Sequence, residues 1–116
     1  MDSKKIAEAF KALTDENRIT ILKTLKDKEL CAGDILEVLD ITQPTLSHHM
    51  KQLTESGLVV ARKQAKFTYY SIDSTLADEI LKTVSDIFGV EEINLRTVVR
   101  EKIVEAPKKD LPSHLL

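Results

Sequence analysis

The feature that most constrains the fold is a change of hydrophobic period at Gly57. Before it, Leu46, Met50 and Leu53 fall within about 60° of one another at ~100° per residue, which predicts an amphipathic helix over 43–56. After it, β-branched and aromatic residues fill the runs 58–62 and 67–72, separated by a polar, basic link at 63–66. This change predicts a helix stopped by glycine and followed by an antiparallel hairpin with a basic tip.

The rest of the chain is predominantly helical in pattern. Thr14 or Asp15 is expected to cap one helix, Thr42 to cap another, and Gly89 to end the last clear one. The expected elements are helices over 3–13, 15–27, 32–39, 43–56 and 74–88, a short strand at 30–31, the hairpin, and a further C-terminal helix over 90–106.

This order predicts a mainly α fold with a small β-hairpin, namely a winged helix-turn-helix. With 116 residues the chain is long enough for one small core and too short for two. We expect residues 1–89 to form that domain, 90–106 to be an extension of it, and 107–116 to be a flexible tail.

Charge is unevenly distributed along a chain whose net charge is −2. Residues 43–72 hold four Lys or Arg against one acid, a net of +3, whereas 1–42 hold seven against nine and 73–116 hold six against nine. A basic segment between acidic flanks is typical of a local phosphate-contacting surface, although a solvated face can cluster charge by chance.

The face of the 43–56 helix opposite the apolar stripe has the chemistry to read DNA. Pro44, His48, Lys51 and Gln52 lie there, with hydroxyl side chains beside them, and from residue 43 to residue 53 the face holds no acid. Hydroxyl, imidazole, amide and ammonium groups can hydrogen-bond base edges and phosphates.

Three segments of the chain resemble a known family. Residues 10–18, FKALTDENR, are similar to the opening motif of ArsR/SmtB-type bacterial transcriptional regulators. Residues 43–53, QPTLSHHMKQL, followed by SGLV at 56–59, resemble the recognition helix of that family, and the hairpin from Arg62 to Tyr70 matches its wing. The resemblance spans residues 6–88.

The resemblance implies a homodimeric repressor whose two recognition helices enter successive major grooves of an imperfect palindrome in double-stranded DNA. The implied DNA-binding residues are Gln43, Thr45, Ser47, His48, Lys51, Arg62, Lys63 and Lys66. The implied dimer interface uses the first helix and the 74–88 helix, through Ile6, Phe10, Leu76, Ile80, Val84 and Ile87. For Gln43 and Thr45 a capping role stays open, and Lys51 could simply be solvated.

Three other side chains are expected to have structural roles. His49 lies about 60–70° from the core direction, so a partly buried packing or capping role is favoured over base contact. Tyr69 and Tyr70 alternate along the hairpin, so one is expected in the core while the other steadies the wing.

No metal site is expected. Sensors of this family often carry Cys-x-Cys, and here Cys31 is followed two residues later by Gly33; the 73–88 segment also lacks histidine. A soft metal needs three or four converging thiolates or imidazoles. Cys31 is therefore expected to be a small buried residue, with a redox role or a site shared with His114 left as alternatives.

The sequence predicts a regulator, with no cofactor and no enzyme signature. The single cysteine and the absence of a long apolar run favour a cytoplasmic protein with no membrane insertion. The main hypothesis is a sequence-specific repressor that is not metal-gated. The alternatives are a winged-helix module that binds protein instead of DNA, and a metal- or redox-responsive repressor using Cys31.

Overall fold

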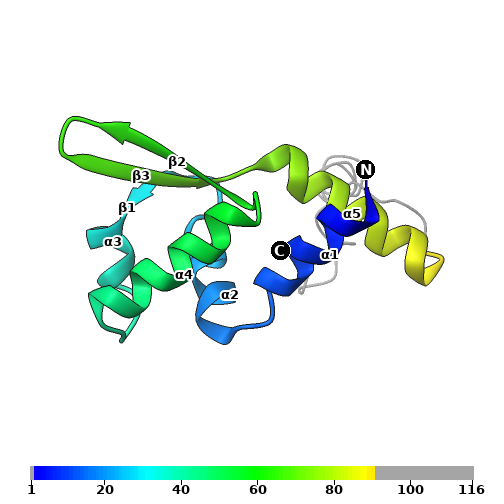
Figure 1. The fold of residues 1–116 in the computed structure, drawn as a ribbon, viewed down its shortest axis with the longest axis horizontal. Helices are drawn as coiled ribbons and strands as arrows, with labels where there is room; N and C mark the ends of the chain where they lie inside the picture. Colours follow the sequence, from blue (N-terminus) through cyan, green and yellow to red (C-terminus); the bar gives the residue numbers. More distant parts are fainter. Residues whose placement is uncertain (1, 91–116) are drawn as a thin grey trace, which may run out of the picture. The chain divides into compact units, whose positions relative to one another are not determined.

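The computed structural model describes residues 2–90, which form five helices and three strands (Figure 1). In chain order these are α1 Ser3–Ala12, α2 Glu16–Thr24, β1 Leu30–Cys31, α3 Ala32–Leu36, α4 Gln43–Glu55, β2 Val59–Gln64, β3 Phe67–Ile72 and α5 Ser74–Phe88. The mainly helical architecture and the predicted element order are confirmed up to α5. The predicted C-terminal helix and tail lie outside the described residues.

The described residues fall into two units, 2–83 and 84–90, with the boundary inside α5. The core and the sheet belong to the first unit. The predicted division after residue 89 remains an expectation.

The three strands form one antiparallel sheet in the order β1-β3-β2. The hairpin β2–β3 extends past the short β1 as a free ribbon (Figure 1). Its link is shorter than predicted, because Lys63 and Gln64 continue β2 and pair with Thr68 and Phe67. A turn this tight requires Ala65 to adopt the left-handed region, at φ 54°.

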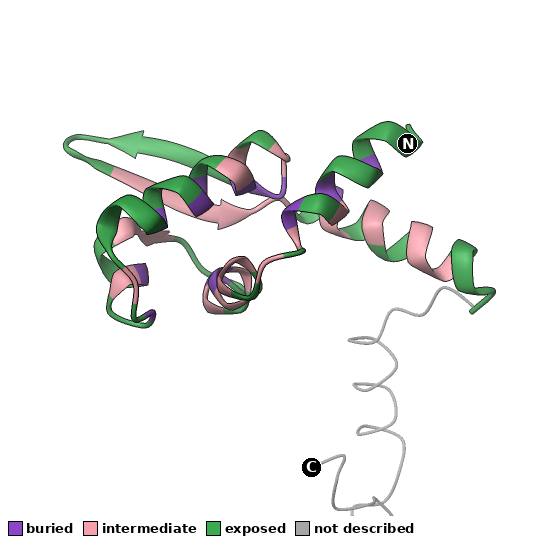
Figure 2. Ribbon diagram, turned by 60° about the horizontal axis from the view of Figure 1, so that its bottom comes forward, coloured by how far each residue is buried: buried purple, intermediate pink, exposed green. Residues whose placement is uncertain are grey.

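The core lies between the helices and the sheet, and the predicted stripe of α4 contributes its centre (Figure 2). The largest fully buried side chains come from three helices and one helix end. They are Ile21 in α2, Leu25 directly after α2, Ile35 in α3, and Leu46 and Leu53 in α4. Each such burial removes a whole aliphatic side chain from water, which stabilises the fold by about 1.5–3 kcal/mol. The recognition-helix candidate α4 is thereby fixed by its apolar face, which leaves the opposite face free.

Local signals set both ends of α4. Thr42 is its N-cap, Pro44 lies in its first turn, and Gly57 follows its C-cap with φ 85°. A Cβ at Gly57 would come 3.2 Å from Leu76 Cδ2, so both backbone conformation and space favour glycine there. Helix α3 ends at Leu36, three residues before the predicted end.

Candidate nucleic-acid interface

The predicted base-reading residues share the exposed face of α4. Gln43, Thr45, Ser47 and His48 are all exposed, as is Lys51, while Leu46, Met50 and Leu53 point into the core. Between residues 43 and 53 this face is polar and holds no acid, as expected from the helical phase; Glu55 is exposed at the C-terminal end of the helix.

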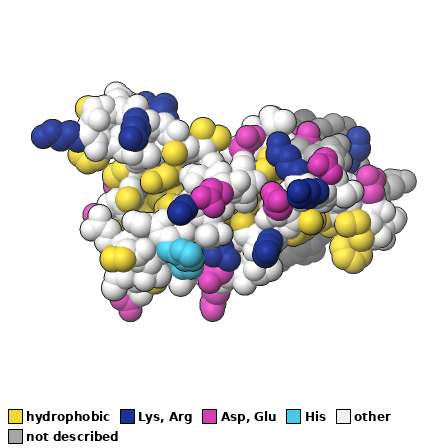
Figure 3. All heavy atoms as spheres, viewed as in Figure 1, with side chains coloured by type: hydrophobic (Ala, Val, Ile, Leu, Met, Phe, Trp, Pro, Cys, Tyr) yellow, Lys and Arg dark blue, Asp and Glu magenta, His cyan; other side chains and the backbone are white. Residues whose placement is uncertain are grey.

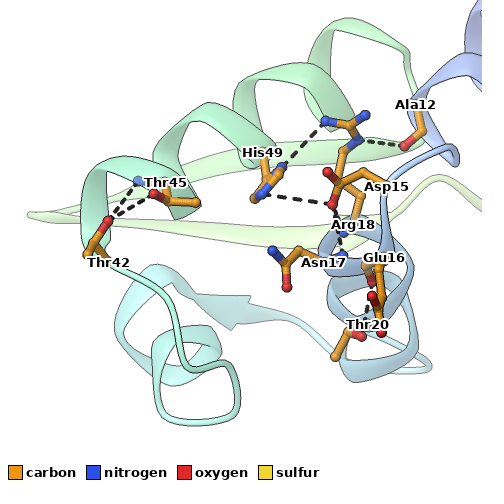
Figure 4. Close-up of polar contacts among 9 residues, drawn as sticks. All are labelled: Ala12, Asp15, Glu16, Asn17, Arg18, Thr20, Thr42, Thr45 and His49. Atoms are coloured by element: carbon orange, nitrogen blue, oxygen red, sulfur yellow. Dashed lines mark hydrogen bonds and ion pairs between the residues drawn. The ribbon is translucent and has the colours of Figure 1, made fainter.

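A cap at the start of α4 fixes the orientation of Thr45. The Thr42 hydroxyl donates to Thr45 Oγ1 at 2.9 Å, and its oxygen accepts from the Thr45 backbone N–H at 3.4 Å (Figure 4). Thr45 Oγ1 already accepts from Thr42, so its own proton remains available for an outside acceptor. This arrangement suits a hydroxyl that donates to a base or a phosphate.

The tip of the wing carries exposed cations. Lys63 near the end of β2 and Lys66 in the turn are both exposed. Figure 3 shows Lys and Arg side chains gathered on the outer end of the hairpin. Exposed ammonium groups on a projecting ribbon can reach the phosphate backbone.

Arg62 differs from these lysines because its exposed guanidinium is paired with other groups of the protein. Its Nε and Nη2 donate to the Glu29 carboxylate at 3.0 and 2.6 Å, and its Nη1 donates to Gln64 Oε1 at 2.7 Å. The guanidinium also lies 5.2 Å from the centre of the Tyr69 ring. The hydrogen bond between the two side chains lowers the pKa of Glu29 and raises that of Arg62. These contacts use three of the five N–H groups of Arg62, so a direct DNA contact, as the resemblance implied, would have to use the two that remain or break the pair.

The two tyrosines divide their roles as predicted. Tyr70 pairs with Leu30 of β1 and packs against the core, whereas Tyr69 carries the Arg62 guanidinium and contacts Phe67 at 6.3 Å between ring centres. Tyr69 thus belongs to the set of contacts that steady the wing.

His49 is a buried polar residue, with 6% of its surface exposed. Its Nδ1 lies 3.4 Å from Nη1 of Arg18, and its Nε2 lies 3.9 Å from Oδ1 of Asp15 (Figure 4). The expected packing role is confirmed, and base contact is excluded by burial. The sequence pattern predicted a cap at Thr14 or Asp15, and Asp15 is the N-cap of α2. The pattern gave no sign that Asp15 and Arg18 would lie beside α4.

The predicted dimer residues differ in how much surface they offer. Ile6 and Leu76 are only 5% and 4% exposed, so they have little area left for a partner; Leu76 lies in the core. Phe10, Ile80 and Val84 are half-buried, and Ile87 is exposed. Exposed apolar side chains on α5 also include Leu81 and Phe88.

Cys31 is half-buried, and the expectation of a buried residue is wrong. It precedes α3, where its thiol donates to an Asp34 carboxylate oxygen at 3.2 Å and its backbone N–H lies 3.3 Å from the same oxygen. The thiol therefore belongs to the polar start of a helix at the sheet edge. Within residues 2–90, no three or more His, Cys, Asp or Glu side chains cluster so as to hold a metal ion.

Fold and interface together define a winged helix-turn-helix DNA-binding protein. Helices α3 and α4 form the helix-turn-helix, and β2–β3 is the wing. None of the described helices is long and apolar enough to cross a membrane.

Comparison with known proteins gives the family. The profile described as "Bacterial regulatory protein, arsR family" matches residues 15–60. The chain is 39% identical over 87 residues to the arsenical resistance operon repressor of Staphylococcus aureus, covering 75% of this chain and 84% of that protein. It is 36% identical over 70 residues to the transcriptional repressor SdpR of Bacillus subtilis, covering 60% and 78%.

Solved structures agree with this assignment. HlyU from Vibrio cholerae superposes with a TM-score of 0.62 at 31% identity, covering 76% of this chain and 98% of that one. The chain belongs to the arsR family of bacterial regulatory proteins, and it is a helix-turn-helix transcriptional repressor, not an enzyme.

Proposed function

We propose that this repressor acts in the cytoplasm as a homodimer on a palindromic DNA operator and that metal does not control it. The observation that carries the proposal is the exposed face of α4, which holds no acid from residue 43 to residue 53 and lies opposite a buried apolar stripe. A helix presented in this way, with a basic wing beside it, fits the major groove while the wing follows the backbone.

The contacts divide into two kinds. Gln43, Thr45, Ser47 and His48 would read base edges, because they offer an amide, two hydroxyls and an imidazole on one face. Lys51, Lys63 and Lys66 would neutralise phosphates, which supplies affinity without sequence preference. Arg62 would contribute by holding the wing, given its contacts with Glu29 and Tyr69.

The dimer is supported by apolar surface on α5. Leu81, Ile87 and Phe88 are exposed large hydrophobic side chains on this one helix. Exposed apolar patches of this kind mark interaction surfaces, and a second copy of the chain would bury them symmetrically. Two copies present two copies of α4, which is the reason to expect a palindrome.

The test is selection of DNA by the full-length protein from a library of random duplexes, followed by titration of the selected duplex. We expect an inverted repeat with half-sites about 10 base pairs apart, bound by one dimer. Recovery of no preferred sequence, together with no binding at low salt, would contradict the proposal and would favour a protein partner for this face.

A further inference from the structure

The inside of α4 carries a polar contact that the DNA-reading face does not explain. His49 is almost fully buried on a helix whose other buried side chains are Leu46, Met50 and Leu53. A buried imidazole loses its water and must find hydrogen-bond partners in the protein. Its partners come from another part of the chain, the junction between α1 and α2.

Arg18 joins this junction to α4. Its Nε donates to the carbonyl oxygen of Ala12, at the end of α1, at 2.7 Å. Its Nη1 lies 3.4 Å from Nδ1 of His49, which is close enough to donate a hydrogen bond (Figure 4). One guanidinium therefore connects the end of α1 to the middle of the recognition helix.

Asp15 completes the arrangement from the other side of the imidazole. Its Oδ1 accepts the backbone N–H groups of Asn17 at 2.8 Å and Arg18 at 3.2 Å, which caps α2. The same oxygen lies 3.9 Å from Nε2 of His49. The carboxylate thus belongs both to the start of α2 and to the surroundings of α4.

One protonation state of the imidazole satisfies both neighbours. Arg18 can only donate, so Nδ1 must be the acceptor and carry no proton. The proton then sits on Nε2, directed toward the Asp15 carboxylate. A ring held in this tautomer has a defined orientation, and apolar packing alone gives no such direction.

Resting on the proposed function, we infer that Asp15, Arg18 and His49 are positioning residues that fix the rotation of α4 about its axis, and hence its reading of DNA. The neighbouring His48 faces outward, with its ring centre 5.8 Å from that of His49. Any rotation that releases His49 moves His48 and Thr45 relative to the bases. Phosphate contacts from the wing tolerate such a rotation. We therefore expect a lower affinity for the selected sequence and an unchanged affinity for other DNA.

The first experiment needs no DNA. In the full-length protein with ¹⁵N-labelled imidazoles, NMR is expected to show His49 as the Nε2–H tautomer with an unprotonated Nδ1, unlike the exposed His48. Arg18→Lys keeps the positive charge but loses the guanidinium that contacts both Ala12 and His49. The ¹⁵N tautomer pattern of His49 should then move toward the averaged pattern of a free imidazole. A protonated Nδ1 in the wild type, or an unchanged signature in Arg18→Lys, would overturn the inference.

The second experiment measures discrimination as the ratio of affinities for the selected duplex and its scrambled version. His49→Leu keeps an apolar side chain of similar size, whereas His49→Asn keeps an acceptor near the position of Nδ1. We expect His49→Leu to lower the ratio at least about fivefold, the loss of one weak base contact, with affinity for scrambled DNA unchanged. His49→Asn should recover most of that ratio.

Thermal unfolding checks that both variants are folded. Equal ratios for His49→Leu and wild type would show that His49 only fills space, and equal losses in His49→Leu and His49→Asn would exclude the Arg18 hydrogen bond as the cause. If His49→Leu does not fold, Arg18→Lys takes its place in the ratio measurement with the same expected loss. If the wild type itself prefers no duplex, the proposed function fails, and the NMR signature alone then reports on the buried contact.

Discussion

Arg62 and Glu29 join the two edges of the three-stranded sheet. Arg62 lies on β2, Glu29 directly precedes β1, and the central strand β3 runs between them with Tyr69 beneath the guanidinium. A two-pronged hydrogen bond of this kind fixes direction as well as distance. The wing is therefore connected to the segment that leads into β1 and α3 by a side-chain pair in addition to the strand ladder.

The pair predicts which cations of the wing neutralise DNA. Lys63→Ala and Lys66→Ala should each flatten the plot of log affinity against log salt by about 0.9 per subunit, since each removes a phosphate contact. Arg62→Gln should leave the slope unchanged, because the guanidinium is already paired. Fluorescence anisotropy between roughly 50 and 300 mM salt measures this slope. An Arg62 variant with the same loss of slope as the lysine variants would show that Arg62 leaves Glu29 to bind phosphate.

The exposed face of α4 predicts a separation between base and phosphate contacts. His48→Ala should weaken binding to the selected duplex by about 1–3 kcal/mol and change binding to random DNA little. Lys51→Ala, one turn away on the same face, is the control and should weaken both. Competition titrations with the two duplexes measure the difference. Equal losses on both DNAs in His48→Ala would show that His48 only positions the protein.

We expect replacing Gly57 and Gly33 by alanine to have opposite effects on stability. Gly57→Ala should destabilise the protein by about 1–2 kcal/mol, since alanine resists the left-handed conformation at φ 85° and its Cβ would crowd Leu76. Gly33→Ala, inside α3 with only an ordinary 3.9 Å contact to Cys31 Sγ, should stabilise it by about 0.5–1 kcal/mol. Urea unfolding monitored by circular dichroism gives both values. Equal changes in the two variants would contradict the account of the turn after α4.

We expect the Asp15 carboxylate to contribute to the loss of stability in acid. Burial raises its pKa, but the hydrogen bonds from the backbone N–H groups of Arg18 and Asn17, with the nearby charge of Arg18, outweigh this and lower the pKa below the ordinary value. With a folded-state pKa below that of the unfolded chain, the unfolded state binds more protons, so stability is lost as pH falls below about 4. Asp15→Asn keeps a capping oxygen and should show a shallower decline in unfolding free energy over that range. If the unfolding free energies of the wild type and Asp15→Asn fall in parallel as the pH decreases, the Asp15 carboxylate does not contribute to the acid sensitivity.

We expect arsenite and zinc not to change DNA binding, because Cys31 offers a single thiol. It is the only cysteine in the chain and donates to Asp34, so it cannot alone complete the three-ligand site that arsenite or zinc requires. Micromolar arsenite or zinc should leave the protein bound to its duplex, with Cys31→Ser as the matched control. Stoichiometric release of DNA in the wild type but not in Cys31→Ser would establish a metal-responsive repressor.

The sequence predicts most of the fold because its signals are local. The apolar stripe of α4, its Thr42 cap and the Gly57 stop all act within a few residues, and Ser74–Phe88 forms the predicted helix. The exposed face of α4 follows from the same helical phase. The predicted contact residues on it are all exposed, while their roles in DNA reading remain predictions.

The contacts between distant segments could not be predicted in this way. Glu29 and Arg62 are 33 positions apart, and Arg18 and His49 are 31 apart; neither pair forms a periodic pattern. They meet only because the sheet order and the packing of α2 against α4 bring them together. The burial of Leu76, which was predicted in the dimer interface, could likewise not be predicted from the sequence. An apolar side chain on an amphipathic helix can face its own core or a second copy of the chain.

The exposed face of α4 is proposed to read duplex DNA. Fluorescence anisotropy of the purified protein against the DNA upstream of its own gene, with scrambled competitor and increasing salt, tests it most directly. We expect saturable binding of one dimer that survives competitor and weakens steeply with salt. No binding to any duplex at low salt would contradict it.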